Sequence, residues 1–289
     1  MKYFIDTKFH EYKKQPKVLG IKVDKPIDTI ELISIGIVSE DIQGTIISPK
    51  EQQEGIDKYG VKFLNTCDTH KEYYAICKEF DIRAAWNNWQ WKDGIVDGVK
   101  EYWLRENVLK TLFNQYDIVI SSYRHLKLMI NKYGKTREQI AEEIKEFINE
   151  RRKDLKQMLD DVEYNRIHNP KDNKVVLPLN EVKPNMFLPQ TEFYAYYADY
   201  DWVVFCWLFG RMIDLPKGFL MYCKDLKQEL DKKVELTNGY GKVKLRTLSV
   251  EEKLEFLKDT EDYPKQTNEH NALAGAKWNK KLYDFINEL

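Results

Sequence analysis

Three residues far apart in the sequence have side chains that could bind a divalent cation or move a proton. Asp6 ends a short apolar run, Asp201 stands at the start of another, and His270 comes just before a helix-like segment. Carboxylates are the ligands that ions such as Mg²⁺ prefer, and a nearby imidazole can take a proton from an activated water. These side chains together predict metal-assisted hydrolysis.

Two positions that would complete such a centre carry another kind of residue. Side chains alternate along a strand, so residue 8 shares a face with Asp6, and residue 8 is a lysine. Residue 275 falls one turn into the helix that follows His270, and it is a glycine. An ammonium group close to two carboxylates competes with any incoming cation, with Coulomb energies of several kcal/mol where solvent is partly excluded. We therefore expect Lys8 to form an ion pair with Asp6 or Asp201 and to replace one metal ion.

Each of these residues also has a plain structural interpretation when it is taken singly. Asp201 could be a helix N-cap, and His270 could be a surface histidine. Three other carboxylates could compensate for the missing ones: Glu11, Asp199 and Glu269. However, Glu11 lies on the other face of its strand, and Asp199 points away from Asp201. A further alternative is that the lysine and the glycine were introduced in a laboratory variant.

The segments around Asp201 and His270 carry more specific patterns. Residues 196–203 read Tyr-Tyr-Ala-Asp-Tyr-Asp-Trp-Val, and residues 270–276 read His-Asn-Ala-Leu-Ala-Gly-Ala. With Asp-Thr-Lys at 6–8, they resemble the three motifs of the DEDDh superfamily of 3′-5′ exonucleases, and in particular those of small bacterial and phage 3′-5′ exoribonucleases. The resemblance covers most of the chain outside two segments, about 40–70 and 153–190.

The resemblance implies an RNase H-like α/β fold, in which helices flank a mixed β-sheet, as a single domain over residues 1–289 with those two segments as insertions. It implies two Mg²⁺ or Mn²⁺ ions, held mainly by carboxylates at positions 6, 8 and 275 with help from Asp201. It also implies that His270 takes the proton of the attacking water, and that the substrate is single-stranded RNA with a free 3′ end. Because Lys8 and Gly275 replace two of the carboxylates, we expect weak metal binding and greatly reduced or absent hydrolysis.

Four residues beside the motifs are candidates for contact with the substrate: Lys8, Tyr200, Trp202 and Asn271. Aromatic rings stack on unpaired bases, and a lysine can bind phosphate. Strand alternation places about half of the nearby aromatic residues in the core instead. The alternative function, from a different class, is a non-catalytic pseudonuclease of a phage or bacterium that binds RNA or a protein.

Hydrophobic patterning predicts the elements that must position these residues. Strands are expected at 1–9, 27–39 and 72–80 as a meander, with a hairpin or loop at 11–26, and at 193–198. The chain begins with strands and continues with helices and one more strand. This order predicts a mixed α/β domain. Helices are expected at 82–89, 99–116, 123–132, 136–152 with a capping box at its start, 201–212, 224–232, 250–257 and 271–289.

Composition sets wider limits on function. The net charge of the 289 residues is −1, so any contact with a polyanion depends on a local basic patch. The four cysteines have no metal-like spacing and are expected to be reduced thiols. The first residues do not resemble a signal peptide, and no apolar run is long enough to span a bilayer. We therefore expect a cytoplasmic protein with no membrane contact, and the resemblance implies that the cell is a bacterium or an infected host.

Overall fold

The computed structural model describes residues 1–18, 21–22, 25–43, 67–68, 70–88, 95–96, 99–100, 102–168, 190–240 and 243–289. Most of the two expected insertions lies outside these residues. At the base of the first, β5 (Ile42–Gln43) pairs antiparallel with β6 (Cys67–Asp68). The second begins inside α4 (Arg137–His168), which continues well beyond the predicted end of that helix at residue 152.

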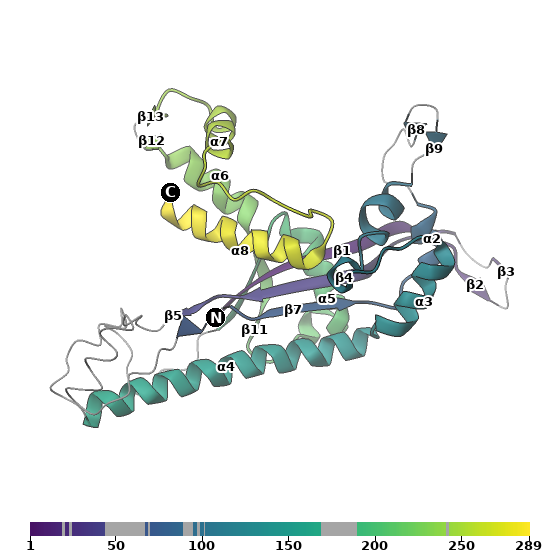
Figure 1. The fold of residues 1–289 in the computed structure, drawn as a ribbon, viewed down its shortest axis with the longest axis horizontal. Coiled ribbons are helices and arrows are strands. Elements are labelled where there is room, and N and C mark those ends of the chain that lie inside the picture. Colours follow the sequence, from purple (N-terminus) through teal and green to yellow (C-terminus); the bar gives the residue numbers. More distant parts are fainter. Residues whose placement is uncertain are drawn as a thin grey trace.

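A five-stranded mixed sheet lies at the centre of the fold, in the order β11-β10-β1-β4-β7 (Figure 1). β1 pairs antiparallel with β4 and parallel with β10. β7 is antiparallel to β4, and β11 is parallel to β10. This arrangement confirms the mixed α/β class and the opening meander of three strands. The bounds are β1 Lys2–Lys14, β4 Ile27–Ser39, β7 Glu72–Ile76, β10 Thr191–Ala195 and β11 Phe219–Asp225.

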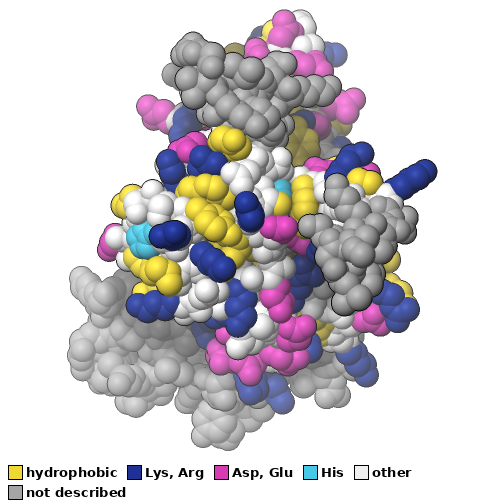
Figure 2. Space-filling view, turned by 90° about the vertical axis from the view of Figure 1, so that its right-hand side faces the viewer, with side chains coloured by type: hydrophobic (Ala, Val, Ile, Leu, Met, Phe, Trp, Pro, Cys, Tyr) yellow, Lys and Arg dark blue, Asp and Glu magenta, His cyan; other side chains and the backbone are white. Residues whose placement is uncertain are grey.

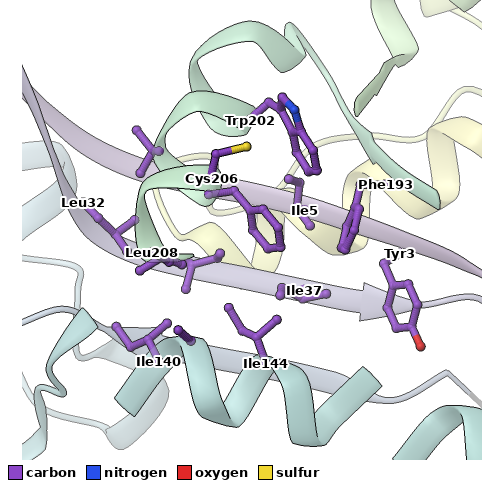
Figure 3. Close-up of a cluster of buried hydrophobic side chains, with 14 of the residues drawn as sticks. Tyr3, Ile5, Leu32, Ile37, Ile140, Ile144, Phe193, Trp202, Cys206 and Leu208 are labelled. Carbon is purple, nitrogen blue, oxygen red and sulfur yellow. The ribbon is translucent and has the colours of Figure 1, made fainter. Parts of the chain in front are cut away.

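Helices cover both faces of the sheet (Figure 1). Because side chains alternate along β1, Phe4 packs on one face with α6, α7 and α8, whereas Tyr3 and Ile5 pack on the other with α4 and α5. Figure 3 shows Ile5 and Phe193 of the sheet beside Trp202 of α5, with Ile144 of α4 nearby. The bounds are α5 Ala198–Phe209, α6 Leu226–Leu236, α7 Val250–Lys258 and α8 Ala272–Glu288.

A third hydrophobic cluster joins Ile33 of β4 and Ile76 at the end of β7 to a helical segment. Seen from this end of the molecule, hydrophobic side chains gather on the surface with lysine and arginine side chains beside them (Figure 2). The segment contains α2 (Ile82–Trp86), a π-helical turn η1 (Arg105–Leu109), a 3₁₀ turn η2 (Asn114–Tyr116) and α3 (Tyr123–Tyr133). The remaining short elements are β2 Lys17–Val18, β3 Ile21–Lys22, β8 Ile95–Val96, β9 Val99–Lys100, η3 Met212–Asp214, β12 Gly239–Tyr240 and β13 Val243–Lys244.

Several predicted boundaries are wrong. β1 continues to Lys14 because its second half keeps pairing with β4, so residues 11–14 belong to the strand. Beyond it β2 and β3 pair antiparallel, which confirms the hairpin expected within 11–26. The predicted helix at 99–116 is broken into β9, η1 and η2, and Val108, Leu109 and Leu112 pack into the third cluster. The predicted helix at 224–232 begins only at Leu226, after a strand that the sequence pattern did not reveal.

Helix α4 begins with the predicted capping box. Thr136 Oγ1 accepts a hydrogen bond from the Gln139 backbone N–H at 3.1 Å, and Gln139 Oε1 accepts one from the Thr136 N–H at 2.9 Å. These bonds satisfy two donors at the start of the helix. Among the described helices, none combines the length and the apolar composition needed to cross a membrane.

Candidate functional site

Asp6 and Lys8 lie side by side on the face of β1 that α8 covers. Lys8 Nζ is 2.8 Å from Asp6 Oδ2, and both side chains are largely enclosed, with 17% and 18% of their surface exposed. Strand alternation accounts for this arrangement, because residues two apart point the same way. The predicted ion pair between Lys8 and the first carboxylate of the site is therefore confirmed.

Asp201 reaches the same strand from α5. The pairing of β1 with β10 stops at Phe4, so the backbone N–H groups beyond it face the start of α5 instead of another strand. Asp201 Oδ1 accepts hydrogen bonds there from the Thr7 backbone N–H at 2.7 Å and from Thr7 Oγ1 at 2.5 Å. Because α5 begins at Ala198, Asp201 lies in its first turn and is not its N-cap.

The start of α8 lies unusually close to the sheet. A Cβ added to Gly275 would be 2.5 Å from Asp6 Cγ and Oδ2, so the carboxylate of Asp6 fills the space that a side chain at 275 would enter. Gly36, the β4 residue paired with Asp6, has the Ala272 carbonyl oxygen only 2.4 Å from its own Cβ position. Glycine at both positions allows this approach. Asn279 Nδ2 then ties the helix to β1 by donating to the Ile5 carbonyl at 2.7 Å.

The electrostatics of the site favour a single shared negative charge. Burial raises the pKa of Asp6, and the nearby Lys8 ammonium opposes this increase. Burial, and then the neighbouring Asp6 carboxylate, raise the pKa of Asp201, whereas the Thr7 hydrogen bonds and Lys8 lower it. Two carboxylates that share an enclosed space do not both ionise readily. The single charge that they hold is balanced by Lys8.

This balance predicts how stability depends on pH. An acid whose pKa is raised by folding binds more protons in the folded state, so stability falls as pH rises from about 4, the unfolded value, through the raised value. Asn at position 201 cannot ionise, yet its Oδ1 can still accept from Thr7. We expect Asp201→Asn to increase the free energy of unfolding by about 2 kcal/mol at pH 8 and to change it little at pH 4. Urea denaturation across this pH range measures the difference, and a variant that is less stable at pH 8 would contradict it.

His270 lies just before α8 at the rim of the site. Its ring makes an edge-to-face contact with Trp103, with centroids 4.9 Å apart at 79°. Burial lowers the pKa of His270, the Lys8 ammonium lowers it further, and Glu269 opposes both. The imidazole is therefore neutral at pH 7 and could accept a proton. Its expected role as the proton acceptor in hydrolysis stays a prediction.

The four candidate substrate contacts have different surroundings. Lys8 is paired with Asp6, and Tyr200 is 49% exposed, with its ring stacked on Phe9 at 5.5 Å. Trp202 instead is buried in the core, where its indole N–H donates to the Met221 carbonyl at 3.2 Å.

Asn271 is also buried and caps α8 by accepting from the Ala274 N–H at 3.0 Å. Trp202 and Asn271 therefore each have a structural role, and their expected contact with the substrate stays a prediction. The same holds for Tyr200 and Lys8, whose side chains are more accessible or lie in the site itself.

The residues present do not fit the two-ion centre that the resemblance implies. Lys8 pairs with Asp6 Oδ2, where its ammonium repels a cation, and position 275 offers no side-chain oxygen. The three possible compensating carboxylates, Glu11, Asp199 and Glu269, are all exposed. Within the described part of the chain, no three or more His, Cys, Asp or Glu side chains gather in a metal-binding arrangement.

Three residues of the site were not predicted from the sequence: Thr7, Gly36 and Trp103. Thr7 stands between Asp6 and Lys8, which were both predicted as site residues. The Thr7 side chain points to the opposite face of the strand, towards α5. Gly36 interrupts an apolar strand, and a glycine inside a strand is a known sign of close backbone approach. Trp103 lies in the segment that was wrongly predicted as a long helix. Neither protein-family models nor curated proteins give a match to this chain.

Proposed function

We propose that this protein binds the 3′ end of single-stranded RNA without hydrolysing it, on an RNase H-like scaffold. The observation that carries the proposal is the Lys8–Asp6 ion pair, with Nζ 2.8 Å from Oδ2, at the position where the exonuclease motifs place metal-binding carboxylates. The mixed sheet with helices on both faces supports the scaffold. Lys8 lies close enough to Asp6, Asp201 and His270 to shift the pKa of all three. This proximity supports the resemblance to the exonuclease motifs.

Charge explains why such a site can hold RNA in the absence of an ion. A cleft with several ionised carboxylates repels phosphate until divalent cations neutralise it. In this protein one shared negative charge is balanced by Lys8, so an incoming phosphate meets no net repulsion. The lysine that excludes the cation therefore also replaces its electrostatic role in binding, while providing no activated water for hydrolysis.

Exposed aromatic rings at the start of α5, on the opposite face of β1 from the ion pair, can hold unpaired bases. Tyr200 and Tyr197 expose 49% and 62% of their surface at the start of α5, and Tyr200 stacks on Phe9, the residue after Lys8. Stacking of a base on an aromatic ring contributes about 1–3 kcal/mol and tolerates any sequence. A lysine and exposed rings around the same strand are the pattern expected for a short single-stranded ligand.

We expect the protein to bind a 5′-labelled oligoribonucleotide equally well in EDTA and in Mn²⁺, and to leave its length unchanged in Mn²⁺. Fluorescence anisotropy measures the affinity, and gel electrophoresis measures the length. Lys8→Met should weaken binding about tenfold, which corresponds to the loss of about 1.4 kcal/mol. Lys13→Met, on the same strand but 73% exposed, is the matched control and should change little.

Each outcome of this experiment is informative. Shortening of the RNA in Mn²⁺ would refute the non-hydrolytic function, and binding that requires Mn²⁺ would refute the role of Lys8. Equal affinity for RNA ending in a 3′-phosphate would contradict recognition of the free 3′ end. Absence of RNA binding under all conditions would exclude the proposal and favour the second candidate.

The second candidate is binding to a protein, favoured by the outward face of α5. Tyr197, Val203 and Trp207 are exposed by 62%, 40% and 47%, and their spacing places them with Tyr200 along one side of the helix. Exposed apolar surface of this kind often marks a protein contact. Trp207 lies more than one turn further along α5 than Tyr200. Under the RNA-binding proposal, Tyr200→Ala weakens RNA binding and Trp207→Ala does not.

A further inference from the structure

A second polar cleft follows the Asp6–Lys8 site along β1. His10 and Tyr12 continue the same alternating face of the strand, with their rings stacked in parallel at 4.3 Å. They form one wall of a cleft of about 450 Å³, whose other wall is α2 with the residues on either side of it. Its lining residues are His10, Tyr12, Asp81, Arg83, Asn87 and Asn88, together with Ala84.

The hydrogen bonds of Asn88 determine which nitrogen of His10 carries the proton. Asn88 Nδ2 donates to the Glu11 carbonyl at 3.1 Å, which fixes the orientation of the amide, and it also contacts His10 Nε2 at 2.8 Å. Nε2 is therefore the acceptor. Burial lowers the pKa of His10 to about 4, so the ring is neutral at pH 7 and its hydrogen lies on Nδ1.

The Nδ1–H group of His10 is a buried donor without a partner among the described residues. The side chain is fully buried, and yet it lines the cleft. Buried donors in folded proteins are almost always paired, and an unpaired one needs an explanation. Because Nδ1 is itself buried, a ligand with an acceptor atom can pair with it only where the side chains that line the cleft move apart. The unpaired donor makes the cleft a candidate binding site.

The charges around the cleft favour an uncharged ligand that has both donors and acceptors. Glu31 is buried behind His10, where it accepts from Lys14 Nζ at 2.9 Å and from the Asp81 N–H at 2.8 Å. Asp81 adds a second carboxylate at the cleft itself. These groups disfavour a polyanion inside the cleft. The exposed guanidinium of Arg83 and the His10 Nδ1–H supply donors, and Asp81 supplies acceptors.

We propose that this cleft binds a nucleobase, with guanine as the best match. Guanine presents two acceptors, O6 and N7, which fit the His10 and Arg83 donors, and it presents N–H donors that fit the Asp81 carboxylate. The rise of a strand places His10 roughly 7 Å beyond Lys8. This inference rests on the proposed RNA-binding function in one respect: the base belongs to a nucleotide upstream of the 3′ end held at Lys8.

Calorimetric titration of the full chain with guanosine, adenosine, cytidine and uridine tests the cleft independently of RNA. We expect guanosine to bind at least tenfold more tightly than the other three nucleosides. Arg83→Ala, at an exposed position that should not disturb folding, is expected to weaken guanosine binding about fivefold. His10→Phe should abolish it. Arg246→Ala, an exposed arginine near the two-stranded β12-β13 sheet, is the control and should have no effect.

Oligoribonucleotides that differ by one guanine or adenine upstream of the 3′ end separate the two proposals. If RNA binds but neither guanosine nor the upstream guanine is preferred, the cleft proposal fails and the RNA-binding function stands. If guanosine binds and RNA does not, the cleft proposal stands and the RNA-binding function fails. If His10→Phe does not fold, an unchanged guanosine affinity in Arg83→Ala would still overturn the proposed recognition.

Discussion

Gly36→Ala is expected to lower the free energy of unfolding by about 3 kcal/mol, at the upper end of the usual range for overpacking. The added methyl group would lie 2.4 Å from the Ala272 carbonyl oxygen and 2.5 Å from Leu273 Cα. These atoms belong to the backbone of α8, so they cannot move aside as the end of a flexible side chain could. The first turn of α8 must lift away from β4 and carry His270 and Gly275 with it.

The matched control for this change is Gly239→Ala. Gly239 is also a strand glycine, but its added methyl group meets one atom, the Val243 carbonyl oxygen, at 3.1 Å. Its effect should stay within about 1 kcal/mol, the ordinary range for surface and glycine substitutions. Urea denaturation followed by circular dichroism measures both variants. Equal stability of the two would show that α8 does not lie against β4 at Gly36.

Lys8→Met is expected to lower the free energy of unfolding by about 3 kcal/mol at pH 7, because removing one partner leaves an enclosed charge without compensation. Asp6 and Asp201 would then share their negative charge without a nearby ammonium. The double variant Asp6→Asn/Lys8→Met should recover most of the loss, since no unpaired charge remains at Asp6. The loss should also shrink towards pH 4, because the raised pKa of Asp6 means that protonation removes its charge.

A double-mutant cycle isolates the coupling between the two side chains. Lys13→Met is the control on the same strand, since Lys13 and Asp28 are 73% and 82% exposed and 3.7 Å apart. Exposed pairs of this kind contribute about 0–1 kcal/mol. A cycle that gives Lys8 and Asp6 a coupling as small as that of the exposed pair would mean that the site does not depend on its built-in cation.

The ion pair also bears on whether a carboxylate could be introduced at position 275. Gly275 has no room for a side chain while Asp6 holds its present position, since the added Cβ would be 2.5 Å from the Asp6 carboxylate. Asp6 in turn is held by Lys8. The two departures from the motif pattern are therefore structurally coupled, and a change at 275 alone would displace Asp6.

The sequence by itself determined the features that depend on local periodicity. Alternation along a strand is enough to place Lys8 beside Asp6, and that pairing is confirmed. Apolar runs predicted the central strands and most helices, and the spacing of Thr136 and Gln139 predicted the start of α4. The order of the three motifs also indicated correctly that Asp6 and Asp201 come together. All of these depend on backbone geometry that repeats every two residues or every turn.

Only the tertiary structure decided how deeply each side chain lies and what it contacts. The sequence could not assign Trp202 to the core, because an aromatic residue in the first turns of a helix faces either way until the sheet is in place. It did not reveal that Asp201 bonds to Thr7, since this contact depends on where β10 stops pairing with β1. It also missed β11, an edge strand whose residues are only partly buried and therefore carry no clear apolar pattern. It missed the break in the helix at 99–116, because burial in a shared core overrides local helix propensity. Depth and contact are set by packing between distant segments, which no local pattern encodes.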